Sequence, residues 1–350
     1  MAIQNSSPKI LLVKLSSLGD VLHNLPLVWD LRARLPNAQI DWVVEEAYVS
    51  LLMPLLSREG FRGVDRIIPF SLRHWKKHLF RLQTWKEFFV FKKDLQAVSY
   101  DVIIETQGLL KSALVCSLAH KSANAVVSGL ANATEFSGYE PIARFFYSQS
   151  VQVPKQCHAV DRSRCVMSAA LDWSLLDRQE NPALFYPDTY IAQLGSSEIS
   201  TKLRVLKKPY ILCFHSTARE AKRWSNSNWI SLGKSLSGKG YQIVFPWGNS
   251  SEKKISAQLA SQIDGAIVPD AFSIQEAFSM VADAALTIGV DTGLTHLAAV
   301  LGKPTVEVYC DSPRWKTEGY WSNRVVNLGD IQAPPTVDEV LDASLRLLAQ

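Results

Sequence analysis

The sequence of 350 residues lacks the patterns that mark a secreted, disulfide-bonded or membrane-spanning protein. Its five cysteines are odd in number and scattered, with no C-x-x-C pair, which predicts a reducing compartment without disulfides or a zinc site. No run of about 18 apolar residues occurs, so we expect no segment that crosses a bilayer. Lys9, Lys14 and Asp20 interrupt every apolar stretch near the N-terminus, so we expect no signal peptide and a cytoplasmic protein.

Several site motifs are missing as well. The chain has no D-x-D pair and no His, Cys and Asp group at metal-ligand spacing, so we expect no metal and no cofactor. It also has no strict G-x-G-x-x-G fingerprint and no Walker A loop, which disfavours a dehydrogenase or a P-loop nucleotide hydrolase. An anionic leaving group would then have to be stabilised by lysine, helix N-termini and backbone N–H groups.

What is present is the pattern of a folded α/β protein. The chain is 47% hydrophobic and 20% charged, and its length suits two domains of roughly 150–200 residues each. Short apolar runs end in small polar loops that open onto helical periodicity, which predicts parallel sheets with helical crossovers. We expect two Rossmann-like α/β/α domains that face a central cleft, with strands at 10–15, 40–44, 101–105, 210–214, 241–245, 266–268, 286–290 and 305–309.

The domain limits follow from a change in periodicity. The apolar pattern weakens over 171–208, where prolines and serines accumulate. We predict a first domain at 1–180, a linker at 181–208 and a second domain at 209–335. Helical spacing of apolar residues in 336–350 predicts a terminal helix. One expected arrangement is that this helix packs back on the first domain.

The most informative segment is 288–296, which reads IGVDTGLTH. Its apolar part ends in Asp291, Thr292 and Gly293, and a helical pattern begins directly afterwards. Such a turn exposes the first N–H groups of the helix to an anion, and glycine lets a ligand approach the backbone. We predict a phosphate site here, with His296 in the first helical turn. The alternative is that Asp291 or Thr292 is only a helix N-cap and His296 a packed core side chain.

Asp20 lies in a similar turn, after the expected strand at 10–15. A positioned carboxylate can take the proton of a hydroxyl nucleophile, so we predict that Asp20 is a general base. The alternative is again a helix N-cap. Gln107, Thr217 and Asp291 also follow expected strands, and ligands of open parallel sheets bind beyond the carboxyl ends of strands. We therefore expect these residues to converge on one cleft.

Two further residues are candidates for donor chemistry. Lys222 follows the polar loop of Thr217 and could hold a leaving diphosphate, although a solvated surface lysine is the common alternative. Glu252 follows a Pro-Trp-Gly turn, where an acidic side chain could bind ribose hydroxyls. Neither residue is specific by itself.

Residues 73–93 form a basic and aromatic segment. Its composition suits an anionic lipid surface, a phosphorylated acceptor or nucleic acid. We expect no nucleic acid, because the formal net charge of the chain is only +4 and the basic residues form one patch. The segment contains one acid, Glu87, seven basic residues (Arg73, Lys76, Lys77, Arg81, Lys86, Lys92, Lys93) and six aromatics (Trp75, Phe80, Trp85, Phe88, Phe89, Phe91).

Taken together, these motifs resemble a known family. The block KLSSLGDVLHNLP at 14–26 resembles the opening motif of the lipopolysaccharide heptosyltransferase I group within glycosyltransferase family 9, whose enzymes invert the sugar. The resemblance continues in order along nearly the whole chain. Its further blocks are DWVVEE at 41–46, RHW at 73–75, QGLLKS at 107–112, HAVDR at 158–162, HSTAREAKRW at 215–224, PWG at 246–248 and GVDTGLTH at 289–296.

This resemblance implies a GT-B fold, with the acceptor site in the first domain and the nucleotide-sugar site in the second. The implied donor is ADP-L-glycero-β-D-manno-heptose, and the implied acceptor is the inner Kdo of Kdo2-lipid A, met at the cytoplasmic face of the inner membrane. Asp20 and Lys222 are the implied catalytic residues. Positions implied in donor binding are Thr217, Ala218, Lys222, Glu252, Phe272, Asp291, Thr292, Gly293 and His296; those implied in acceptor binding are Ser17, Gly19, Arg73, Lys76, Lys77, Gln107, Lys111, His158 and Arg162.

The chain departs from the family pattern at three places. Ala218 replaces a second hydroxyl, Tyr139 stands where an acceptor-motif arginine is common, and Phe272 stands near a common methionine. Two other functions remain open from sequence: a related heptosyltransferase that adds a later core sugar, and a non-catalytic protein that binds nucleotide or lipopolysaccharide. The SSLGD loop at 16–20 favours the first-heptose enzyme over a later-sugar enzyme, and the intact phosphate loop and the presence of Asp20 disfavour the non-catalytic protein.

Overall fold

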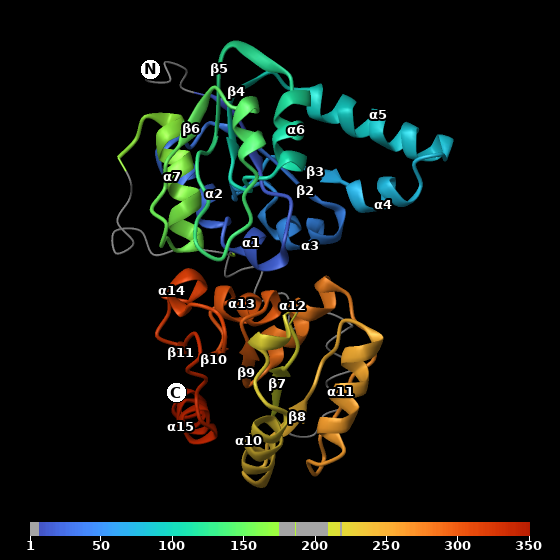
Figure 1. The fold of residues 1–350 in the computed structure, drawn as a ribbon, viewed down its shortest axis with the longest axis vertical. Coiled ribbons are helices and arrows are strands. Elements are labelled where there is room, and N and C mark those ends of the chain that lie inside the picture. The colour runs from blue at the N-terminus through green and yellow to red at the C-terminus, as the bar shows by residue number, and fades with distance from the viewer. Residues whose placement is uncertain (1–6, 175–185, 187–208, 218) are drawn as a thin grey trace. The chain divides into compact units, whose positions relative to one another are not determined.

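The computed structural model describes residues 7–174, 186, 209–217 and 219–350 (Figure 1). The chain divides into two compact units, Met1–Leu184 and Phe185–Gln350. The predicted linker at 181–208 lies, except for Tyr186, outside the described residues, as does Ala218. Each unit is built around its own parallel sheet.

The sheet of the first unit has six parallel strands in the order β3-β2-β1-β4-β5-β6. Its central strand β1 is buried on both faces, because Ile10 to Val13 have no exposed surface and pair with β2 on one side and β4 on the other. This double burial explains the continuous apolar run in the sequence. The strands are β1 (Lys9–Val13), β2 (Gln39–Glu45), β3 (Arg66–Phe70), β4 (Tyr100–Glu105), β5 (Lys121–Leu130) and β6 (Gln149–Val151).

Helices cover both faces of this sheet (Figure 1). On one face, α2 and α7 are joined by a buried ion pair in which Arg164 donates from Nε to Asp30 at 2.7 Å. On the other face, α5 and α6 enclose an apolar core that includes Phe91 and Val115. The helices are α1 (Leu18–Leu22), α2 (Pro26–Arg34), α3 (Val49–Leu52), α4 (Leu72–Lys77), α5 (Leu82–Gln96), α6 (Leu110–Leu118) and α7 (Ala159–Leu171), with short 3-10 turns η1 (Glu46–Tyr48), η2 (Met53–Leu55) and η3 (Pro141–Phe146).

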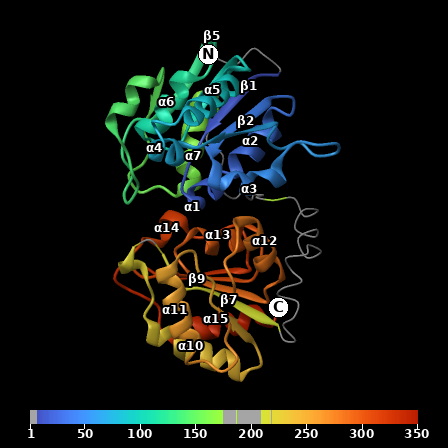
Figure 2. The same ribbon diagram turned by 90° about the vertical axis from the view of Figure 1, so that its right-hand side faces the viewer.

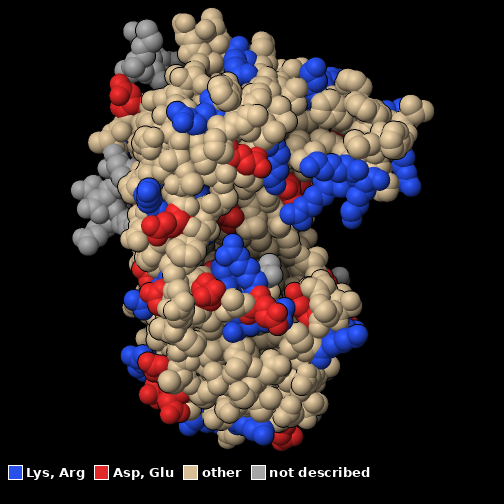
Figure 3. Space-filling model, viewed as in Figure 1, with Lys and Arg blue, Asp and Glu red and all other residues tan. Residues whose placement is uncertain are grey.

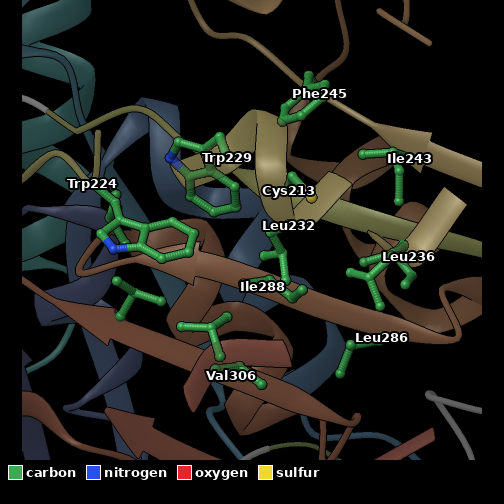
Figure 4. Close-up of a cluster of buried hydrophobic side chains, with 14 of the residues drawn as sticks. Cys213, Trp224, Trp229, Leu232, Leu236, Ile243, Phe245, Leu286, Ile288 and Val306 are labelled. Atoms are coloured by element: carbon green, nitrogen blue, oxygen red, sulfur yellow. The ribbon is translucent and has the colours of Figure 1, made fainter. Parts of the chain in front are cut away.

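The sheet of the second unit has five parallel strands in the order β11-β10-β9-β7-β8 (Figure 1). Its neighbouring strands β7 and β9 are labelled in the turned view of Figure 2. Trp224 and Trp229 meet edge to face at 5.2 Å in its core, beside Ile288 and Phe245 (Figure 4). The elements are β7 (Tyr210–Phe214), η4 (Glu220–Lys222), α10 (Asn226–Gly238), β8 (Gln242–Val244), α11 (Ser250–Ala260), α12 (Ile274–Asp283), β9 (Leu286–Val290), α13 (Gly293–Val300), β10 (Thr305–Tyr309), α14 (Arg314–Thr317), β11 (Val325–Gly329) and α15 (Val337–Leu348).

The structure differs from the sequence-based expectations in several elements. Two helices, α1 and α2, follow β1, because Pro26 has no N–H to continue the first and starts the second instead. Residues 266–268 form only one isolated bridge, between Ile267 and Val244, and no strand. Strands β3, β5, β6 and β11 were not expected.

The terminal helix α15 packs within its own unit. Val340, Ala343 and Leu347 are buried in the core of the second unit, where the helix lies against α10 and β10. This corrects the arrangement in which the helix would pack back on the first domain. The apolar face of α15 packs on the sheet of its own unit, because α15 follows β11 of that sheet along the chain.

Candidate active site

The loop between β1 and α1 holds Asp20 in the first unit. Ser17 is the N-cap of α1, and Asp20 is the third residue of that helix. The backbone N–H and the hydroxyl of Ser17 both donate to Oδ2 of Asp20, at 3.1 and 2.8 Å. The carboxylate is therefore part of a capping box, but the cap itself is Ser17. Its second oxygen, Oδ1, is left for other partners.

Two cations face that second oxygen. Lys14 Nζ lies 3.8 Å and Arg162 3.9 Å from Oδ1 of Asp20, and both cations are almost fully buried while the side chain of Asp20 is 37% exposed. Burial raises the pKa of Asp20, but the charges of Lys14 and Arg162 and the hydrogen bonds from Ser17 outweigh it and hold that pKa well below its usual range. Asp20 is therefore an ionised carboxylate at neutral pH on a partly exposed side chain.

A second set of contacts supports the Asp20 loop from β4 and α6. The side-chain oxygen of Gln107 accepts from the backbone N–H groups of Leu15 and Ser16, each at 3.2 Å. Lys111 Nζ donates to Ser16 Oγ at 2.9 Å and to Glu45 at 3.0 Å. Gln107 and Lys111 were predicted to bind an acceptor; in the structure they also hold the loop that presents Asp20.

The other predicted acceptor residues lie at differing depths. Arg73 is 70% exposed and pairs with buried Glu45 at 3.0 Å, and Lys76 and Lys77 are exposed on α4. Arg162 is buried, and besides Asp20 it contacts Thr134 at 3.3 Å.

His158 is buried, and its Nδ1 accepts the N–H of Val160, so it caps the start of α7. Gly19 and Ser17 lie in the Asp20 turn itself. Tyr139, which replaces the family arginine, has a buried hydroxyl without a hydrogen-bond partner among the described residues.

In the second unit, Asp291 lies between β9 and α13. Thr292 is the N-cap of α13, and its side chain makes no capping hydrogen bond. The first N–H groups of the helix, from Gly293 onward, thus receive no bond from that side chain. The N–H groups of Thr295 and His296 donate to the backbone oxygen of Thr292, which leaves those of Gly293 and Leu294 at the start of this eight-residue helix, where an anion could approach. Thr292 occupies the N-cap position and His296 is buried, as the alternative foresaw, and the phosphate site stays a prediction.

The carboxylate of Asp291 begins a buried chain of charged groups. Lys222 Nζ donates to its Oδ2, and His296 Nε2 lies 3.0 Å from its Oδ1. The other ring nitrogen of His296 lies 2.8 Å from Glu307, which also accepts from the hydroxyl of Tyr309 at 2.9 Å.

This chain of contacts sets the charge of His296. Burial lowers the pKa of His296, but the nearby carboxylates of Glu307 and Asp291 outweigh it and raise the pKa to about 10. Burial also raises the pKa of Asp291, and the hydrogen bond and charge of His296 together with Lys222 reverse this, so that pKa is strongly lowered. His296 is an imidazolium ion between two carboxylates, one turn from the free N–H groups of α13. A positive charge is thereby fixed next to the start of α13.

The other described residues predicted to bind the donor are Thr217, Glu252 and Phe272. Thr217 donates through Oγ1 to the backbone oxygen of Asp291 at 3.4 Å. Glu252, in the first turn of α11, accepts from Gly248 N at 2.7 Å and from Asn249, so it supports its own loop. Phe272 is half-buried in the loop before α12.

Three residues with a strong effect on these sites were not predicted as site residues. Lys14 directly follows β1, Glu45 is the last residue of β2, and Glu307 lies inside β10 between valines. A charged residue in a continuously apolar strand needs a buried partner, and this was the available signal for Glu307. The partner itself could not be known from sequence. Among the described residues, no group of three His, Cys, Asp or Glu side chains could hold a metal ion, and no helix is long and apolar enough to cross a membrane.

Comparison with known proteins gives a consistent result. The model of glycosyltransferase family 9 (heptosyltransferase) matches residues 88–343. Over 319 residues the chain is 32% identical to lipopolysaccharide heptosyltransferase 1 of Salmonella typhimurium, covering 91% of this chain and 93% of that protein. Over 327 residues it is 32% identical to lipopolysaccharide heptosyltransferase 1 of Pseudomonas aeruginosa, covering 93% of this chain and 85% of that protein.

Solved structures agree with the sequence matches. The Escherichia coli heptosyltransferase WaaC with ADP superposes with a TM-score of 0.77 at 29% identity, covering 97% of this chain and 99% of that chain. WaaC with ADP-2-deoxy-2-fluoro heptose gives 0.72 at 28% identity, with coverages of 97% and 98%. The expected GT-B fold, with two parallel-sheet α/β units, is confirmed. The chain is therefore an enzyme, a glycosyltransferase, and belongs to glycosyltransferase family 9, the heptosyltransferase family.

Proposed function

We propose that this enzyme transfers L-glycero-D-manno-heptose from ADP-heptose to the inner Kdo of Kdo2-lipid A in lipopolysaccharide core biosynthesis. The observation that carries the proposal is the near full-length likeness to WaaC solved with ADP and with an ADP-heptose analogue. The charged loop at α13 supports it, because it offers a diphosphate what it requires: free N–H groups and fixed positive charge.

The second unit is the proposed donor site. The N–H groups at Gly293 and the imidazolium of His296 would face the diphosphate. The ammonium group of Lys222, which donates to Asp291, would also donate to the departing ADP. Charge that is already in place at the leaving group stabilises the transition state more than charge that must reorganise. We further propose that Thr217 and the Ala218 backbone approach the phosphates, that Glu252 binds ribose and that Phe272 stacks on adenine.

The first unit is the proposed acceptor site, with Asp20 as the general base. Oδ1 of Asp20 takes the proton of a Kdo hydroxyl while that oxygen bonds to the anomeric carbon of heptose. The anomeric C–O bond to ADP breaks on the opposite side, so the configuration inverts through an oxocarbenium-like transition state. Because the pKa of Asp20 is low, bond formation runs ahead of proton transfer, and the carboxylate receives the proton as the attacking oxygen becomes acidic.

Acceptor anions would be held by the basic residues around this loop. Arg73, Lys76 and Lys77 are exposed at the start of the basic segment, and Lys111 and Arg162 adjoin the Asp20 loop. Carboxylates and phosphates of the acceptor suit this arrangement. An acceptor embedded in a membrane leaflet implies that the enzyme works as a peripheral protein at the cytoplasmic face of the inner membrane.

The test is transfer by the wild type and by Asp20→Ala, with ADP-heptose and with two acceptors: Kdo2-lipid A, and the same acceptor already carrying the first heptose. We expect wild-type transfer to the first acceptor only, and its loss in Asp20→Ala with ADP binding retained. Unchanged turnover in Asp20→Ala would remove the proposed base. Transfer only to the second acceptor would instead identify an enzyme that adds a later heptose.

A further inference from the structure

An apolar pocket of about 650 Å³ lies between the α4–α5 segment and α6 in the first unit. Its volume lies within the range of roughly 300–1,000 Å³ that is usual for ligand sites. Its walls are mainly hydrocarbon and aromatic, with side chains from α4, α5 and α6 such as Leu72, Trp75, Phe88, Leu110 and Leu114. Polar side chains also line it: Lys76, Thr84, Lys111, Ser117 and Glu140. The apolar part of the pocket therefore suits a hydrocarbon ligand, and no role assigned above uses that part.

One wall of the pocket is a fixed aromatic cluster. Trp75 is buried, meets Phe70 edge to face at 5.3 Å and Phe88 at 5.7 Å, and donates from Nε1 to Glu87 at 3.3 Å. Contacts on several sides of one ring hold its orientation. The pocket is thus formed before any ligand enters, which lowers the entropy cost of binding.

The polar end of the pocket adjoins the acceptor loop. Lys111 lines the pocket, and its Nζ contacts Ser16 Oγ at 2.9 Å, next to the residue that caps Asp20. Lys76 also lines it and is exposed. A ligand in the pocket would therefore have its anionic or sugar-bearing end at the Asp20 loop.

Part of the rim opens towards an exposed apolar surface. Leu79 and Trp85, at the rim, are 50% and 51% exposed, and Phe80 and Leu82 beside them are 102% and 82% exposed. Lys and Arg side chains gather over the same α4–α5 segment (Figure 3). Lysine beside exposed aromatic groups is typical of segments that lie at an anionic lipid surface.

We propose that this pocket binds one acyl chain of the glycolipid acceptor, with the sugar head at the Asp20 loop and the chain running towards the exposed rim. The inference rests on the proposed function for the identity of the acceptor. It is carried by the match between an amphiphile and a pocket whose two ends differ in polarity. The acyl chain would then add affinity and orient the Kdo hydroxyl towards Asp20, because each buried methylene favours binding.

The first experiment measures binding directly, without catalysis. The probe is 12-bromododecanoate, a fatty acid whose bromine quenches tryptophan fluorescence on contact, added as a monomer to the full-length enzyme. We expect saturable quenching, since Trp75 and Trp85 line the pocket. Leu114→Asp, which places a carboxylate in the wall at a half-exposed position, should weaken binding at least about tenfold. The matched control Leu82→Asp, on an exposed residue outside the lining, should bind as the wild type does.

The second experiment compares Kdo2-lipid A with its chemically deacylated form in the same nonionic micelles. Leu114→Asp should raise KM at least about tenfold for the acylated acceptor while KM for the deacylated one and kcat stay unchanged. An equal effect on both acceptors, or quenching that persists in Leu114→Asp, would overturn the pocket proposal.

Wild-type transfer to neither acceptor would count against the proposed function. The quenching result would then still decide whether the pocket binds an acyl chain.

Discussion

Asp20 and Asp291 occupy the same place in two similar units, yet their surroundings differ. Both follow a central parallel strand and both carry a strongly lowered pKa. Asp291 is 9% exposed, and both of its oxygens are held, by Lys222 and by His296. Asp20 is 37% exposed, and its Oδ1 faces cations only at 3.8 and 3.9 Å, beyond hydrogen-bond distance. The carboxylate of Asp291 is built into a charge network, and the carboxylate of Asp20 is partly exposed and makes no hydrogen bond to the two cations it faces.

The difference shows that the turn from strand to helix places a carboxylate at the end of the sheet. The neighbouring side chains then determine its charge, its exposure and its hydrogen bonds. In the second unit, Lys222 from η4, His296 from α13 and Glu307 from β10 join Asp291 in a buried network whose two cations and two carboxylates balance. In the first unit, buried Lys14 and Arg162 keep Asp20 ionised without blocking it. The following predictions test this contrast, from the largest expected effect to the smallest.

Asp20→Asn should lower kcat by about 10²–10⁴-fold, because the amide cannot accept the proton of the acceptor hydroxyl. It should leave ADP affinity close to that of the wild type and lower thermal stability, because the amide oxygen can still accept from Ser17 while buried Lys14 and Arg162 lose the negative charge they face. Turnover by stopped assay and ADP binding by calorimetry check this. A fall of less than about threefold in kcat would show that the carboxylate of Asp20 has no catalytic use.

Asp291→Asn should act on stability and donor binding together. Removing the carboxylate leaves Lys222 and the imidazolium of His296 without their shared partner in a buried site, which typically costs about 3–5 kcal/mol. Urea unfolding and ADP calorimetry of the same protein would measure both effects. If Asp291→Asn were as stable as the wild type, the carboxylate of Asp291 would not be the buried charge partner that distinguishes it from Asp20.

The charge network predicts a specific pH dependence. His296 has a pKa raised from 6.5 to about 10, so its contribution is fully present below pH 6.5 and is lost as pH rises through about 10. Asp291 has a lowered pKa, so its contribution is present above about pH 4 and is lost as pH falls. Urea unfolding between pH 7 and 10 should show falling stability in the wild type and a flatter profile in His296→Gln. Identical profiles would mean that the ring is not held protonated.

Glu45→Gln should have the smallest effect, about tenfold or less in kcat/KM. Glu45 joins Arg73 and Lys111 at 3.0 Å each, so it orients cations around the Asp20 loop without approaching the carboxylate of Asp20 itself. The loss should fall on KM for the acceptor, with KM for ADP-heptose unchanged. Steady-state kinetics with each substrate varied separately would separate the two.

The sequence allowed much of the fold to be predicted where strands are buried on both faces. Strands at 210–214, 286–290 and 305–309 agree with the structure to the residue, because continuous apolar runs between polar loops have one interpretation in a parallel sheet. Strands β5 and β11 were missed, since β5 begins with polar and small residues and β11 is a partly exposed edge strand. The split into α1 and α2 could have been expected from Pro26.

The candidate site was predictable only in part. Asp20, Asp291 and Gly293 could be placed from sequence because a turn after an apolar strand is a local feature. Glu45 and Glu307 could not, because their significance comes from partners such as Lys111 and His296 that lie on other elements. Acceptor and donor roles for all of these residues stay predictions.

By itself the sequence determined the alternation of buried strand, polar turn and helix, because periodicity and turn chemistry act over a few residues. Tertiary structure alone decided which cations face which carboxylate, that α15 packs on its own unit and that α4, α5 and α6 enclose an apolar pocket. The physical reason is that ionisation and burial depend on distances between groups far apart in the chain, and those distances exist only once the sheets have formed.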